Sequence, residues 1–136
     1  MSVVLDSSAT LAWVHGDERT AAIEAVFDRV AERGAVVPSL WHLEVANSLT
    51  VAVRRERISP AERADALADL AHLDIAVDDE TQQHAWKATM QLADLHGLSV
   101  YDASYLELAQ RKRLPIVTLD KALIRAAQAA GVEVLM

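Results

Sequence analysis

The chain has 136 residues, and its composition of 52% hydrophobic but only 4% aromatic side chains allows a buried core that needs no metal or disulfide. It contains no cysteine, which excludes disulfides, thiolate metal sites and cysteine nucleophiles. Its formal net charge is −7, from 13 basic and 20 acidic side chains, which argues against a protein that binds nucleic acid mainly by neutralising phosphates over its whole surface.

No apolar stretch approaches the roughly 18 residues that are needed to cross a bilayer. Met1-Ser2 leads directly into the apolar letters VVL, without a basic leader or a cleavage site. Together with the absence of cysteine, these features predict a cytoplasmic protein that is neither secreted nor membrane-spanning.

Short apolar runs rich in β-branched residues alternate with helical patterns along the chain. The runs that predict buried strands are 2–5, 35–38, 74–77, 115–119 and 132–135. The helical patterns cover 8–14, 17–34, 39–57, a segment that begins at Ser59-Pro60, 79–97, a segment that begins at Ser99, and 121–130. Strands that alternate with helices through short connections predict a single α/β domain over 1–136, with a mostly parallel sheet of four to five short strands and helices on both faces.

Two aspartates directly follow predicted strands: Asp6 comes after the first strand and Asp120 after the fourth. Parallel α/β sheets bind ligands beyond the carboxyl ends of their strands, so both side chains are expected at one edge of the sheet. Each residue also has a simpler interpretation, as the N-cap of the helix that follows it. The sequence leaves both interpretations open.

Glu44 lies among apolar residues in the segment PSLWHLEVANSL. The apolar stripe of this predicted helix includes Trp41 and Val45, and Glu44 falls beside them on the inward side. Counted from Ser39, Glu44 lies about two turns inside the helix, too deep for a capping role. A glutamate that faces a core needs a partner. The residues that would make a structural ion pair with it are His42, Arg54, Arg55 and Arg57.

Asp102 is a carboxylate on an apolar helical face in the segment LSVYDASYLELAQ. It shares that face with Tyr105 and Leu106, because residues three and four apart lie on the same side of a helix. If Ser99 is the N-cap, Asp102 occupies the third helical position, and Ser-x-x-Asp is a capping box. A capping role and a functional role both remain open.

These four carboxylates can converge on one pocket only if something compensates their charges. Like charges about 4 Å apart repel by roughly 4 kcal/mol at an effective dielectric constant near 20, so the group needs protons or a bound cation. Oxygen ligands favour Mg²⁺ or Mn²⁺ over Zn²⁺ here, because the chain has no cysteine and its five histidines are scattered singly.

Four segments occur in order along almost the whole chain: VVLDSSATLAW, PSLWHLEVANSL, LSVYDASYLELAQ and LPIVTLDKAL. Together they resemble the signature segments of PIN-domain ribonucleases, in particular the VapC-type toxins of bacterial type II toxin–antitoxin pairs. In that family the acidic residues of these segments form the catalytic metal site. The matching acidic positions are Asp6, Glu44, Asp102 and Asp120. The small polar positions beside them, which would orient ligands or water, are Ser7, Asn47 and Thr118.

The resemblance implies a Mg²⁺-dependent endoribonuclease, with Mn²⁺ able to substitute, that cleaves structured RNA of the transfer or ribosomal class. It also implies a homodimer and neutralisation by a cognate VapB-type antitoxin. The apolar helical faces within 64–73 are a candidate dimer interface. The alternative from another class is a catalytically inactive PIN-fold module that binds a protein partner.

Two short basic runs, RRER at 54–57 and RKR at 111–113, have the charge that a phosphate substrate would need. Runs of this kind are more often solvated helix C-termini that complement the helix dipole. Taken alone, each run is therefore predicted to be a solvated helix end.

Overall fold

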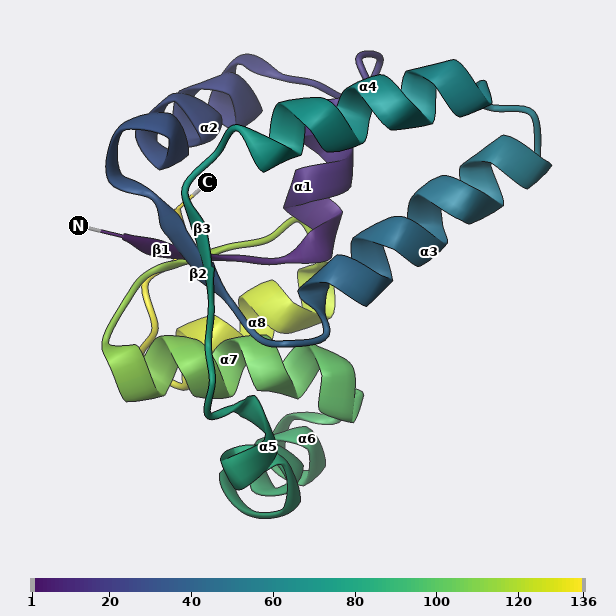
Figure 1. Cartoon of the computed structure of the whole chain (residues 1–136). Coiled ribbons are helices and arrows are strands. Elements are labelled where there is room, and N and C mark those ends of the chain that lie inside the picture. Colours follow the sequence, from purple (N-terminus) through teal and green to yellow (C-terminus); the bar gives the residue numbers. More distant parts are fainter. Residues whose placement is uncertain (1, 136) are drawn as a thin grey trace.

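Four short parallel strands form one sheet at the centre of the computed structural model, which describes residues 2–135 (Figure 1). The strands are β1 (Val3–Leu5), β2 (Ala35–Val37), β3 (Ile75–Val77) and β4 (Ile116–Val117), in the order β3-β2-β1-β4. All three pairings are parallel, which confirms the predicted α/β class. The segment predicted as a fifth strand at 132–135 contributes only an isolated bridge between Val134 and Ile116.

Helices cover both faces of this sheet. They are α1 (Ser7–Val14), α2 (Ala21–Arg33), α3 (Trp41–Arg54), α4 (Pro60–Ala71), α5 (Thr81–His84), α6 (Met90–His96), α7 (Val100–Lys112) and α8 (Lys121–Ala129). Figure 1 shows α1 and α2 on one side of the sheet and α7 on the other, while α3 and α4 pair and extend away from it. Within residues 2–135, every helix is too short or too polar to span a membrane.

The centre of the core is β1, whose three residues are fully buried, because helices cover the strand from both sides. Helix α7 packs against β1 and β4, and its residues from Ala103 to Ala109 are all buried. A helix enclosed on nearly all sides has little amphipathic character, so α7 shows a weak apolar stripe despite its central position.

Three predicted helices differ from the structure. The helix predicted from residue 17 begins at Ala21, because Thr20 is its N-cap and accepts a hydrogen bond from the Ile23 N–H. The segment 79–97 is not one continuous helix, because a π-helical stretch at Ala85–Thr89 separates α5 from α6. Helix α3 begins at Trp41 rather than at Ser39, because a turn with the Trp41 N–H bonded to the Pro38 carbonyl precedes it. Glu44 therefore lies in the first turn of α3, and the prediction that it lies two turns inside was wrong.

Candidate active site

The four predicted carboxylates lie on elements that begin at the carboxyl ends of strands or pack beside them. Asp6 follows β1, Glu44 is in the first turn of the helix after β2, Asp120 follows β4, and Asp102 is in the first turn of α7. We call Asp6, Glu44, Asp102 and Asp120 the acidic centre. Asp102 links the group electrostatically, because its charge acts on Asp6 and on Glu44, while the charge of Asp120 acts on Asp102.

Asp6 is the most buried member of the acidic centre, with 3% of its surface exposed. Its carboxylate accepts hydrogen bonds from the Ala9 N–H at 3.0 Å, the Thr118 hydroxyl at 2.5 Å and the Ser8 hydroxyl at 2.8 Å. Burial nevertheless raises the pKa of Asp6 from 3.8 to about 6, against the lowering effect of these bonds, and the charge of Asp102 adds to the rise. The Ala9 bond confirms that Asp6 also caps α1.

Glu44 is held by a tyrosine rather than by a basic residue. The Tyr105 hydroxyl donates a hydrogen bond to Glu44 Oε1 at 2.5 Å, and no ion pair joins Glu44 to a basic side chain within residues 2–135. Burial raises the pKa of Glu44; the bond from Tyr105 opposes this rise, and the charge of Asp102 adds to it. Burial and the bond to Glu44 also raise the pKa of Tyr105, which keeps its hydroxyl protonated as a donor.

The two remaining carboxylates lie at helix N-termini. Ser99 caps α7 and accepts a hydrogen bond from the Asp102 N–H at 3.0 Å, which confirms the predicted N-cap; the reciprocal bond of a capping box, from the Ser99 N–H to the Asp102 carboxylate, is absent among the described residues. Asp120 caps α8, and its side chain accepts a bond from the Leu123 N–H at 2.9 Å. Burial raises the pKa of Asp102, and the charge of Asp120 adds to the rise. Capping thus coexists with membership of the acidic centre for Asp6 and Asp120, whereas the cap of α7 is Ser99 and not Asp102.

The small polar residues have unequal roles. Thr118 is fully buried; its hydroxyl donates to the Asp6 carboxylate and accepts from the Asp120 N–H at 3.1 Å, so it joins the Asp6 side chain to the backbone at Asp120. Ser7 lies close enough to Glu44 for its hydroxyl to oppose, weakly, the rise that burial causes in the pKa of that carboxyl. Asn47 is exposed, and within the described residues no hydrogen bond joins it to the acidic centre.

Ser8 was missed in the sequence analysis. Its hydroxyl donates to Asp6 and accepts from the Leu119 N–H at 3.0 Å, so it joins the first turn of α1 to the loop after β4. A serine two residues after an aspartate that caps a helix is the local signal for such a bond, since hydroxyls of this kind readily bond nearby groups.

The acidic centre fits a divalent cation. In the described part of the chain none of its carboxylates takes part in an ion pair, and the pKa values of Asp6, Glu44 and Asp102 are raised by burial and then by their neighbours. Carboxylate oxygens whose negative charges have no basic partner favour a hard cation such as Mg²⁺. In the structure no three of these four residues place carboxylate oxygens within 4.8 Å of one another, so they do not form a closely packed ligand set.

A second acidic cluster, Asp78-Asp79-Glu80, does have oxygens within 4.8 Å of one another. Its buried member, Asp78, already has a cation, because Arg111 bonds both carboxylate oxygens at 3.1 and 2.6 Å. Arg111 also bonds Glu107 at 2.8 Å. The prediction that the run 111–113 is a solvated helix end was therefore wrong for Arg111, whose side chain is only 18% exposed.

The protein has a parallel sheet with several carboxylates near the carboxyl edge of its strands. In residues 2–135 none of these carboxylates is paired with a basic side chain, so the fold and site define an α/β protein with an acidic centre. Residues 3–129 match the PIN domain family, and the chain belongs to that family. It is 31% identical over 123 residues to Ribonuclease VapC3 of Pyrobaculum aerophilum. The matched region covers 90% of this chain and 92% of that relative.

Solved structures share the fold. The crystal structure of PAE2754 from Pyrobaculum aerophilum has a TM-score of 0.71 at 22% identity, over 99% of this chain and 84% of that chain. The crystal structure of FitAcB from Neisseria gonorrhoeae has a TM-score of 0.61 at 18% identity, over 98% and 96%. A toxin–antitoxin complex from Klebsiella pneumoniae has a TM-score of 0.56 at 15% identity, over 88% and 87%.

Proposed function

We propose that this protein is a Mg²⁺-dependent endoribonuclease of the VapC type that cleaves structured RNA of the transfer or ribosomal class. The observation that carries the proposal is the acidic centre: four carboxylates on a PIN domain, electrostatically coupled through Asp102 and without basic partners in residues 2–135. The similarity to a ribonuclease at 31% identity supports the choice of RNA as substrate.

Each residue has a proposed task in phosphodiester hydrolysis. Asp6 and Asp102 would hold the cation, and Glu44 and Asp120 would complete its surroundings or orient the attacking water. A bound divalent ion lowers the pKa of its water and stabilises the charge that develops on the phosphate. Thr118 and Ser8 fix the orientation of Asp6 through their hydroxyls, which prepares the carboxylate before the ion arrives.

The direct test is cleavage of total cellular RNA by the purified protein with Mg²⁺ or Mn²⁺, beside an EDTA sample and an Asp6→Asn variant. Discrete fragments that require both the metal and Asp6 would support the proposal. An absence of both cleavage and metal binding would overturn it and favour the catalytically inactive protein-binding module.

The partner expected with such an enzyme is a VapB-type antitoxin, and the site of action would be the cytoplasm, where its RNA substrates are found. A toxin–antitoxin complex among the structures with this fold supports the proposal of an antitoxin. Co-expression with a small protein encoded beside this chain tests it: a stable complex that suppresses RNA cleavage is expected.

A homodimer is also proposed, through a surface formed by α6, the π-helical stretch and the start of α7. Trp86 is 86% exposed, Leu95 74% and Tyr101 66%, and Met90 on α6 is 45% exposed. Exposed apolar side chains in such number favour a protein interface over open solvent. The segment 64–73 offers less, since its one large exposed apolar residue is Leu67. A Trp86→Glu variant is expected to shift the protein from dimer to monomer in light scattering.

A further inference from the structure

The basic run at 54–57 contributes two arginines to a hollow that extends toward the acidic centre. A hollow of about 350 Å³ runs between α1 and the C-terminal half of α3. Its walls include Ser8 and Leu119 at one side and His15, Arg55 and Arg57 at the other. We call this hollow the arginine groove. Ser8 bonds Asp6, and Leu119 precedes Asp120, so one end of the groove borders the acidic centre, although none of the four carboxylates lines the groove itself.

Local backbone structure brings both arginines to the groove. Helix α3 ends in a Schellman motif, in which the Glu56 N–H bonds the Val53 carbonyl and the Arg57 N–H bonds the Ala52 carbonyl. Glu56 occupies the left-handed conformation of this motif, with φ of 57°. The chain therefore reverses after Arg55, and Arg57 returns toward α1, where it reaches Glu18 at 3.3 Å.

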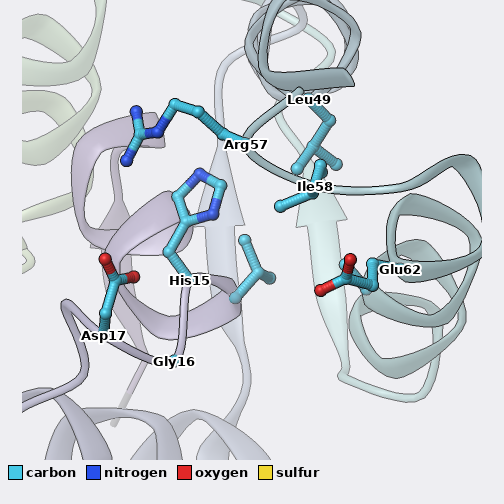
Figure 2. A pocket seen from close by; sticks show the side chains of 9 residues that line it. His15, Gly16, Asp17, Leu49, Arg57, Ile58 and Glu62 are labelled. Carbon is cyan, nitrogen blue, oxygen red and sulfur yellow. The ribbon is translucent and has the colours of Figure 1, made fainter. Parts of the chain in front are cut away.

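The groove carries excess positive charge on a protein that is acidic overall. Glu18 is its one acidic wall residue and is already paired with Arg57. Arg55 is exposed and takes part in no ion pair in residues 2–135. Arg57 and His15 also line the adjoining hollow of about 300 Å³ at the end of α1, with Asp17 and Glu62 at its borders (Figure 2). His15 and Arg57 are therefore shared by the two hollows.

This charge pattern suits the backbone of the RNA strand that enters the acidic centre. Carboxylates repel a phosphodiester, so a nuclease of net charge −7 needs positive charge on the path of approach. From Ser8 to His15 the groove follows α1 for about 10 Å, at a rise of about 1.5 Å per residue. Leu11 and Leu119 give it an apolar wall on which the sugar or base of a nucleotide can pack.

We infer that the arginine groove binds the sugar–phosphate backbone of the RNA next to the bond that is cleaved, with Arg55 contacting a phosphate. This inference rests on the proposed ribonuclease function and names the path of its substrate. A planar guanidinium is suited to bidentate contact with phosphate oxygens.

Fluorescence anisotropy with a labelled single-stranded RNA of about ten nucleotides tests the inference. EDTA is present throughout, so that binding is measured without cleavage. The wild type is compared with Arg55→Ala, with Arg55→Lys and with Arg33→Ala. Arg33 is a matched control, because it is exposed and lies before β2, at the opposite edge of the sheet from the acidic centre.

Loss of one phosphate contact should lower the slope of log affinity against log salt by about 0.7, which corresponds to about fivefold weaker binding at 0.1 M salt. Arg55→Ala is expected to show both effects, Arg55→Lys to retain most of the slope, and Arg33→Ala to match the wild type. Equal effects of Arg55→Ala and Arg33→Ala, or no RNA binding by the wild type, would overturn the inference.

The two proposals fail in different experiments. If the protein cleaves RNA with metal but its RNA affinity is unchanged in Arg55→Ala, the proposed ribonuclease function is supported and the proposed role of the arginine groove is refuted. If RNA affinity depends on Arg55 but no metal supports cleavage, the role of the arginine groove in RNA binding is supported and the proposed catalytic function is refuted.

Discussion

The hydroxyl of Tyr105 on α7 donates a 2.5 Å hydrogen bond to the carboxylate of Glu44 on α3, across 61 positions of sequence. Tyr105 is 1% exposed, so its ring is fixed in the core. Asp102 lies three residues earlier on the same helix. One buried helix therefore sets the position of two members of the acidic centre, one directly and one through the tyrosine.

Tyr105→Phe should reduce RNA cleavage by roughly tenfold or more, because a hydrogen bond to a charged group contributes about 1.5–3 kcal/mol. The ring still fills the core, so the fold should persist. The bond from Tyr105 lowers the pKa of Glu44, so its loss should raise that pKa further and move the acidic limb of the pH–rate profile to higher pH.

The matched control for this variant is Tyr101→Phe, which removes the same hydroxyl from a side chain that is 66% exposed. A purely structural role of Tyr105 would lower the melting temperature without moving the acidic limb. A pH–rate profile of Tyr105→Phe that superimposes on the wild type would refute the positioning role.

Asp6→Asn should abolish cleavage and yet raise the melting temperature of the metal-free protein near neutral pH. The pKa of Asp6 is raised by burial to about 6 in the folded chain, from an ordinary value of 3.8. Protonated Asp6 therefore stabilises the folded state. This contribution to the free energy of unfolding is fully present below about pH 4 and is lost as the pH rises through about 6. Asparagine stays neutral and still caps α1. In thermal melts in EDTA, the difference in melting temperature between Asp6→Asn and the wild type should increase from about pH 4 to 7. A difference that stays constant over this range would contradict the raised pKa of Asp6.

Much of this site was predictable because its signals are local. Asp6 and Asp120 follow apolar runs, and the parallel topology brings strand ends together. The start of α3 was misplaced because Ser39 has the residue type of an N-cap, whereas its N–H bonds Thr81 and the turn at Pro38 precedes the helix. A partner 42 positions away leaves no local signal.

The buried pair of Arg111 and Asp78 was unpredictable for the same reason. The two residues are 33 positions apart, and an arginine in the last turn of a helix usually faces solvent. Nor does a glycine or proline mark the π-helical stretch inside the segment 79–97. Local pattern thus located the carboxylates, while their contacts required the tertiary structure.

Mn²⁺ should raise the melting temperature of the wild type, since a ligand that binds only the folded state stabilises it by about 2.7 kcal/mol at a hundredfold excess over Kd. Asp102→Asn should lose most of this gain, because Asp102 is coupled electrostatically to each of the other three carboxylates. Asp79→Asn, in the second acidic cluster, should keep it. Loss of the gain in Asp79→Asn but not in Asp102→Asn would move the metal site to that cluster.

Arg111→Met should destabilise the protein by about 3–5 kcal/mol near neutral pH, because it leaves the buried carboxylates of Asp78 and Glu107 without their cation. Burial acts to raise the pKa of Asp78, but the bonds and charge of Arg111 outweigh it and hold that pKa below its ordinary value. In the wild type, the stability that the Arg111–Asp78 pair contributes is therefore present above about pH 4 and is lost as the pH falls through the lowered pKa of Asp78. Without Arg111 the pKa rises, so the deficit of the variant should shrink from about pH 7 to 4 as Asp78 takes up a proton. Urea denaturation at both pH values measures this, with exposed Arg113→Met as the control, and an equal deficit at both would mean that Arg111 acts through packing alone.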